Sequence, residues 1–109
     1  MEKITVKEKE YTLNLRMQDL IAFEKETGKN PMDIFIKAAS DVEKMQAGVI
    51  ESFPLSFTDI CNVLKFSLKQ HHAKMTENQV LQLIDDYLEE EHSIQDLMEL
   101  TMALMQRFF

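Results

Sequence analysis

Hydrophobic and polar residues alternate strictly only near the start of the chain. The apolar members of this pattern are Ile4, Val6, Tyr11, Leu13 and Leu15. A period of two is typical of strands with one buried face. The sequence KEKE at 7–10 separates the two alternating runs, so we expect a β-hairpin over about residues 3–15 with its turn in KEKE. That turn lacks the Asn-Gly or Asp-Gly pair that favours the tightest hairpins.

Beyond residue 16 the apolar positions recur at helical spacing. Five segments predict helices, over about residues 17–27, 31–46, 57–72, 77–91 and 94–108. Gly28 suits the position after a helix, because glycine readily adopts the left-handed conformation that ends many helices. Asn30 and Pro31 suit a helix cap and a first helical position. The pattern is weakest from Asp41 to Pro54, where we expect a helical extension up to Gly48 and then a loop.

Each of the last three expected helices is preceded by a capping-box sequence. These are Ser56-x-x-Asp59, Thr76-x-x-Gln79 and Ser93-x-x-Asp96. In a capping box the hydroxyl accepts from a free backbone N–H of the first turn, and the side chain three residues later reaches back to the N–H of the cap residue. The first and third use aspartate where glutamate or glutamine is usual. Together they predict where these helices begin.

Composition supports one mainly helical domain. The chain has 109 residues, 45% of them hydrophobic, with two glycines and two prolines. A chain of this length can bury a core, and the scarcity of turn-forming residues favours long helices over a turn-rich β fold. We therefore expect residues 1–109 to form a single, mainly α domain, with the N-terminal β-hairpin packed on a compact bundle of about four or five helices.

Charge and cysteine usage restrict the partners and the compartment. The formal net charge is −7, which disfavours nucleic acid and anionic membrane surfaces as partners. No apolar run approaches the ~20 residues of a membrane span, and the N-terminal MEKITVKEKEY lacks the apolar core of a signal peptide. A single cysteine fits a reducing compartment. We therefore expect a soluble cytoplasmic protein.

The stretch LIDDYLEEEH at 83–92 concentrates five carboxylates and a histidine. Its Glu89-x-x-His92 pair has the spacing of di-iron sites in helical bundles, but such a site needs two of these pairs and two further glutamates. At ~100° per residue, most of the acids fall opposite the apolar arc of the expected helix. An amphipathic helix needs such a polar face for solvation alone. We therefore predict no metal site in this stretch.

Other chemically capable residues also favour structural roles. A zinc site could recruit the three histidines and Asp85, but no HExxH or close Cys/His cluster accompanies them. The histidines are His71, His72 and His92, and the first two fall at the end of an expected helix, where cations are favoured. Cys61 lies on an apolar helical face, as a small buried hydrophobe would. Because catalytic and phosphate-binding motifs are also missing, we predict a protein that is not an enzyme and needs no cofactor.

The segment SIQDLMELTMALMQRFF at 93–109 has more apolar surface than one-sided packing requires. Its apolar arc covers roughly 200° of the helical wheel, where about 100° suffices. One stripe, expected to face the core, comprises Ile94, Leu97, Thr101, Leu104 and Phe108. The neighbouring stripe comprises Met98, Met102, Met105 and Phe109, and Leu100 widens the arc on the other flank. Either the domain wraps this helix on several sides, or part of the arc faces a partner.

The methionine-rich stripe is the candidate binding surface. Methionine side chains are flexible and polarizable, which suits surfaces that accept varied apolar clients. We therefore take Met98, Met102, Met105 and Phe109 as candidate partner-binding residues. The partner would be a second copy of this chain or a client protein.

The chain resembles a family of phage proteins. The hairpin ITVKEKEYTLNLRM is followed by MQDLIAFEKETGKNPMDIF and then by an acidic helical remainder. In order and size this arrangement resembles the tail assembly chaperones of long-tailed phages of Gram-positive hosts, and the likeness covers most of the chain. LIAFEKETGKNPMDIF is the most suggestive piece. No catalytic or ligand-binding motif forms part of the likeness.

The resemblance implies a small, mainly helical protein that acts in the cytoplasm of an infected or lysogenic bacterium. Its partners would be the long tape measure protein, which such chaperones coat, and the tail tube subunits, which they recruit around it. The finished virion is expected to lack these chaperones. A second, longer form made by translational frameshifting is common in the family.

Two other functions stay open at this point. A small acidic helical protein could be a regulatory inhibitor, such as an antirepressor or an anti-defence protein that mimics the charge of DNA. A charge mimic would spread its carboxylates widely, whereas here they concentrate in residues 85–91. A cryptic metal protein is disfavoured by the number of ligands. A neighbouring gene for a very long helical protein would favour the chaperone over both.

Overall fold

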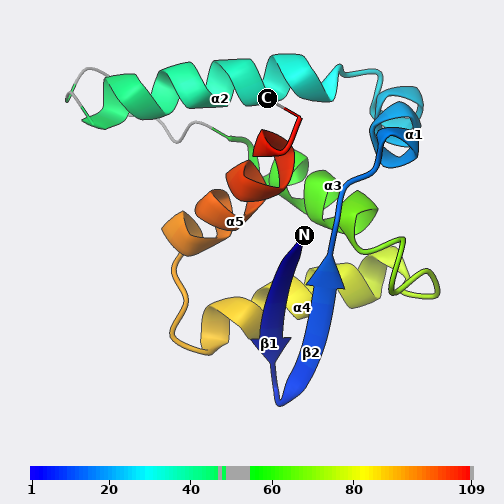
Figure 1. The fold of residues 1–109 in the computed structure, drawn as a ribbon. Helices are drawn as coiled ribbons and strands as arrows, with labels where there is room; N and C mark the ends of the chain where they lie inside the picture. The colour runs from blue at the N-terminus through cyan, green and yellow to red at the C-terminus, as the bar shows by residue number, and fades with distance from the viewer. Residues whose placement is uncertain (47, 49–54, 109) are drawn as a thin grey trace.

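Figure 1 shows the computed structural model, which describes residues 1–46, 48 and 55–108. Within these residues a two-stranded hairpin is followed by five helices, which confirms the expected fold class. The elements are β1 (Glu2–Val6), β2 (Lys9–Leu13), α1 (Met17–Thr27), α2 (Pro31–Gln46), α3 (Phe57–Ser67), α4 (Glu77–Glu89) and α5 (Ile94–Gln106). Most of the loop expected before residue 55 lies outside the described residues.

The hairpin turn is tighter than the sequence predicted. β1 and β2 pair antiparallel with Val6 opposite Lys9, so Lys9 and Glu10 of the expected KEKE turn belong to β2 instead. Only Lys7 and Glu8 form the turn, and both have positive φ, 49° and 66°. A two-residue type I′ turn requires positive φ at both residues. The backbone twist of this turn matches the natural twist of the two strands.

The first two helices have the expected bounds, but the last three end early. α3 stops at Ser67 instead of residue 72, and the Ser67 hydroxyl donates to the Leu64 carbonyl at 2.8 Å. The Ser67 carbonyl accepts from the Asn14 N–H at 2.8 Å. A contact from the hairpin side therefore occupies an acceptor that a longer helix would use. α4 and α5 end at Glu89 and Gln106 instead of 91 and 108.

Side chains begin the later helices as the sequence predicted, with one exception. Complete capping boxes join Thr76 to Gln79 and Ser93 to Asp96. Ser56 Oγ accepts from the Asp59 N–H at 3.0 Å. The Asp59 carboxylate, however, accepts from Lys29 Nζ at 3.0 Å instead of completing the box. The start of α3 is thereby tied to the connection between α1 and α2.

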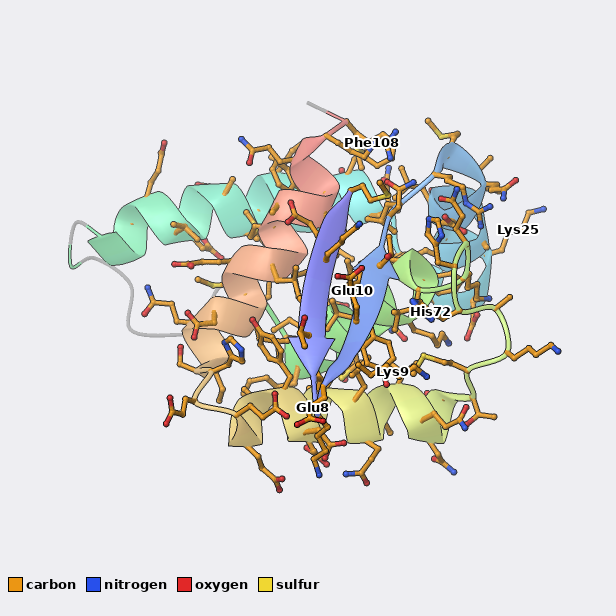
Figure 2. All side chains as sticks on the ribbon, turned by 60° about the horizontal axis from the view of Figure 1, so that its bottom comes forward. Glu8, Lys9, Glu10, Lys25, His72 and Phe108 are labelled. Atoms are coloured by element: carbon orange, nitrogen blue, oxygen red, sulfur yellow. The ribbon has the colours of Figure 1, made fainter. Side chains whose placement is uncertain are left out.

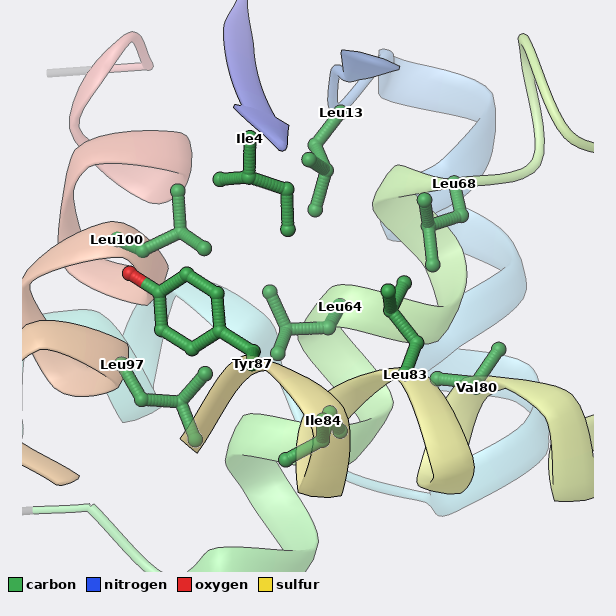
Figure 3. Close-up of a pocket in the computed structure, with 10 residues that line it drawn as sticks. All are labelled: Ile4, Leu13, Leu64, Leu68, Val80, Leu83, Ile84, Tyr87, Leu97 and Leu100. Atoms are coloured by element: carbon green, nitrogen blue, oxygen red, sulfur yellow. The ribbon is translucent and has the colours of Figure 1, made fainter. Parts of the chain in front are cut away.

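α5 occupies the middle of the fold. In Figure 1 it crosses between α2 and the hairpin, while α4 lies at the end of the molecule opposite α2. α5 contacts α2, α3 and β1, and α4 contacts α3 and β1. Figure 3 shows Ile4 and Leu13 of the hairpin pointing toward side chains of α3 and α4. This packing stabilises the hairpin, because an isolated two-stranded sheet is marginal in water.

One buried hydrophobic cluster draws members from every described strand and helix. Phe23 of α1 and Phe66 of α3 are among its largest side chains, and their rings meet edge-to-face with centroids 5.6 Å apart. Burying a side chain of this size contributes about 1.5–3 kcal/mol. The described elements therefore share a single core, and the hairpin is part of it.

Candidate protein-binding surface

The structure places two of the three described residues of the predicted α5 stripe inside the domain. Met98 is 4% exposed and Met105 is fully buried, so the expectation that they lie on the surface is wrong. Met102 is half-buried against the core. Phe109 lies outside the described residues. The described methionines of α5 therefore form no exposed stripe.

The central position of α5 explains this burial. Its two apolar stripes pack in different directions, because α2, α3 and β1 all contact the helix. Leu97, Thr101 and Leu104 are buried as expected, and the Thr101 hydroxyl donates to the Leu97 carbonyl at 2.9 Å. Ile94, expected in the core, is 42% exposed as the first residue of the helix. The wide apolar arc thus reflects wrapping by the domain, which is the alternative that the sequence left open.

An open apolar groove lies instead along α1 and the start of α2. It has a volume of about 260 Å³ and is lined by Met17, Leu20, Ile21, Glu24, Asn30, Pro31, Met32 and Phe108. Phe108, half-buried rather than in the core, reaches it from the chain beyond α5 (Figure 2). Met17 is 61% exposed and Ile21 is 50% exposed. We take this α1 groove as the candidate functional site.

α1 forms the groove because it carries two adjacent apolar stripes. Leu20 and Phe23 point into the core and are buried. Met17 and Ile21, four positions apart, lie one above the other on the neighbouring face, and Glu24 continues that line with a carboxylate. The sequence pattern did not predict this site. The one sequence feature that indicates it is the apolar arc of α1, which is wider than a single stripe. The helix at 94–106 has a wide apolar arc of the same kind.

Two caps at the connection between α1 and α2 shape the end of the groove. Gly28 ends α1 with φ of 71°, and its N–H donates to the Glu24 carbonyl at 2.8 Å. Asn30 Oδ1 then accepts from the Met32 N–H at 2.9 Å, which confirms the cap predicted from the sequence. The cap that ends α1 and the cap that begins α2 are only two residues apart, at Gly28 and Asn30. This short connection restricts the direction of α2 relative to α1. The side chains of Pro31 and Met32 are thereby brought beside α1.

The groove suits apolar contact more than catalysis. Its polar side chains are the Glu24 carboxylate and the Asn30 amide, and neither is paired with a nucleophile in the lining. Next to the groove, the Arg107 guanidinium lies 5.3 Å from the centre of the Phe108 ring and donates to the Leu15 carbonyl at 2.9 Å. The wall formed by Phe108 is therefore anchored. Such a surface can bind apolar side chains and orient a cationic neighbour through Glu24.

The acidic end of α4 is engaged with the hairpin. The Lys7 N–H donates to Glu90 Oε1 at 2.5 Å, and Lys7 Nζ lies 3.3 Å from Asp86 Oδ1. A hydrogen bond from Gln82 and the charge and hydrogen bond of Lys7 lower the pKa of the Asp86 carboxyl. Across the part of the chain that the structure describes, no three His, Cys, Asp or Glu side chains come together in a way that could hold a metal ion.

The three histidines lie in separate surroundings. The sequence placed His71 and His72 at a helix end, but α3 stops at Ser67 and both lie in the turn before α4. His72 Nε2 accepts from the Thr12 N–H at 3.1 Å, while His71 is exposed. His92 stacks on the Tyr87 ring with centroids 4.0 Å apart. The three side chains therefore do not lie together in one cluster.

Cys61 is half-buried beside a second apolar hollow. This hollow has a volume of about 230 Å³ and is lined by Phe57, Ile60, Cys61, Ile84, Leu88, Ile94 and Leu97. Burial, followed by the charges of Asp85 and Glu77, raises the pKa of the thiol. An activated cysteine nucleophile needs the opposite shift. The environment therefore favours the role of an apolar side chain.

Comparisons with protein-family models, with curated protein sequences and with solved structures found no match. The fold and the groove define the class in structural terms: a mainly helical protein with an N-terminal hairpin and an open apolar surface on α1. No helix among the described residues combines the length and apolar character needed to cross a membrane.

Proposed function

We propose that this chain is a non-enzymatic binding protein, a phage or prophage tail assembly chaperone that coats the tape measure protein and recruits tail tube subunits. The supporting observation is that the α1 groove coincides with LIAFEKETGKNPMDIF, the segment that most resembles this family. Every groove residue except Met17 and Phe108 belongs to that segment. In this function the protein acts in the bacterial host cytoplasm and is absent from the mature virion.

The groove supports a weak, repeated contact with a helical client. A client helix with apolar residues four positions apart would place them against Met17 and Ile21, which share that spacing. Each Å² of apolar surface removed from water contributes about 25 cal/mol. A stable pairwise complex usually buries about 1,200–2,000 Å², far more than one small groove offers. Copies that also contact one another along one long client would bind more tightly, because each bound copy raises the effective concentration of the next at its neighbouring site.

A matched pair of isoleucine substitutions tests the groove. Ile21 lines it and is 50% exposed, whereas Ile36 on the outside of α2 is 56% exposed and does not line it. Binding to purified fragments of the tape measure protein encoded beside this chain's gene would be measured by calorimetry. Ile21→Gln is expected to weaken binding by about tenfold, because it removes most of one buried apolar side chain from the contact. Ile36→Gln should leave the affinity unchanged.

Thermal melts of both variants provide the folding control. Both side chains are largely exposed, so both variants should melt close to the unsubstituted chain. If the unsubstituted chain does not bind any tape measure fragment, the proposed function is wrong. If it binds and the two variants lose affinity equally, the function stands and the α1 groove is not its site.

A further inference from the structure

His72 is the point at which the turn between α3 and α4 meets the outer edge of β2. Its Nε2 accepts from the Thr12 N–H at 3.1 Å, and its ring centre lies 5.2 Å from that of Tyr11. Figure 2 shows His72 beside β2, on the same side as Lys9. Outward N–H groups of an edge strand otherwise bind water or another strand. The imidazole therefore covers an exposed backbone donor of the hairpin.

Only a neutral imidazole can make this contact. Neutral histidine carries one donor and one acceptor nitrogen, whereas the protonated ring donates from both. Protonation of His72 would therefore direct an N–H at the Thr12 N–H. Two donors facing each other across 3.1 Å have no shared acceptor, so the ring would have to move away.

The charged surroundings of His72 favour the neutral ring. The hollow around it is lined by Lys65 of α3, by Lys69 of the turn that follows, by Glu26 of α1 and by Glu77 of α4. Of the two carboxylates, Glu26 is already paired with Lys65 at 2.5 Å. Burial, followed by the positive charges of Lys9 and His71, lowers the pKa of His72. The contact is therefore complete at neutral pH and is lost only at lower pH.

We propose that protonation of His72 breaks the contact of its ring with the outer edge of β2, so that the Thr12 N–H is released as the pH falls, while the Asn14 side-chain amide still donates to Gln70 Oε1 of the same turn at 2.8 Å. The rest of the hairpin stays in place. Lys7 holds its tip to α4, and Asn14 holds its base through the Ser67 carbonyl. The change is local: it frees the Thr12 N–H without unfolding the domain.

The test follows the Thr12 amide by ¹⁵N NMR in the full chain, from about pH 7.5 to about pH 5, the range in which histidines titrate. The Thr12 amide shift is expected to move with the same midpoint as the His72 ring resonances. Protection of this amide from hydrogen exchange, corrected for the intrinsic effect of pH, should fall by about two- to tenfold, the range expected for loss of one hydrogen bond.

Two glutamine variants separate His72 from its neighbour. In His72→Gln the side-chain oxygen can still accept from Thr12 but does not titrate, so the Thr12 transition should disappear. His71→Gln should retain it. The proposal is overturned if the Thr12 amide does not follow the His72 ring in the unsubstituted chain, or if the same transition persists in His72→Gln. The first comparison decides the matter even if His72→Gln does not fold.

Discussion

The buried carboxylate of Asp19 accepts three hydrogen bonds from Arg16 at the start of α1. One comes from the Arg16 backbone nitrogen at 2.9 Å, and two come from its guanidinium at 2.9 and 3.0 Å. Hydrogen bonds between charged partners are shorter and stronger than neutral ones. Asp19 is only 3% exposed, so this pair holds the first turn of the helix that forms the wall of the α1 groove.

Asp19→Ala is expected to lower the free energy of unfolding by about 2–3 kcal/mol, because it removes a charged acceptor and leaves Arg16 without its partner. Urea denaturation measures the loss. Asp33 is a matched control: it occupies the corresponding place in the first turn of α2 and is exposed. Asp33→Ala should cost less than about 1 kcal/mol, and equal losses would contradict the importance of the Arg16 contact.

Met105→Ala should destabilise the domain by about 2–5 kcal/mol, the usual cost of truncating a fully buried methionine. Met105 is 0% exposed, whereas Met102 is only partly buried on the same helix. Met102→Ala should therefore cost markedly less in the same denaturation experiment. A larger loss for Met102 would show that the packing of α5 differs from that described.

Glu8→Gly should stabilise the hairpin. Glu8 has φ of 66°, and a non-glycine residue in this left-handed region costs roughly 1–2 kcal/mol. Glycine removes this cost, but it loses more conformational freedom on folding, which offsets part of the gain. We expect a net gain of about 0.5–1 kcal/mol, measured by thermal unfolding. Glu10→Gly, within β2, should instead destabilise the chain. A gain in both variants would argue against the type I′ turn.

Cys61 should react slowly with thiol reagents. Its pKa is raised, chiefly by burial and then by Asp85 and Glu77, so at about pH 8 the folded chain holds less thiolate than the urea-unfolded chain. Alkylation rates in the two states test this. Because the pKa of the thiol is higher in the folded chain than in the unfolded chain, Cys61 contributes to the free energy of unfolding. This contribution is fully present below the ordinary thiol pKa and is lost as the pH rises through the raised pKa of the folded chain. A faster reaction in the folded state would show an activated thiol.

The order and type of the elements follow from local patterns in the sequence. Period-two alternation predicted the hairpin, and apolar spacing with caps predicted the bounds of α1 and α2 and the starts of α3, α4 and α5. These features depend on residues a few positions apart, whose hydrogen bonds form within one turn or one strand pair. The capping box at Ser56 shows where prediction from local sequence fails. The Asp59 carboxylate accepts a hydrogen bond from Lys29, which lies in another segment, and does not complete the box.

The end of α3 and the location of exposed apolar surface depend on contacts between segments that are distant in the sequence. α3 stops where Asn14 takes the Ser67 carbonyl. A helical wheel gives the width of an apolar arc but not the number of elements that cover it. Packing of α2, α3 and β1 around α5 buries Met98 and Met105. The face of α1 that carries Met17 and Ile21 stays open among the described residues, because burial depends on which segments meet in space.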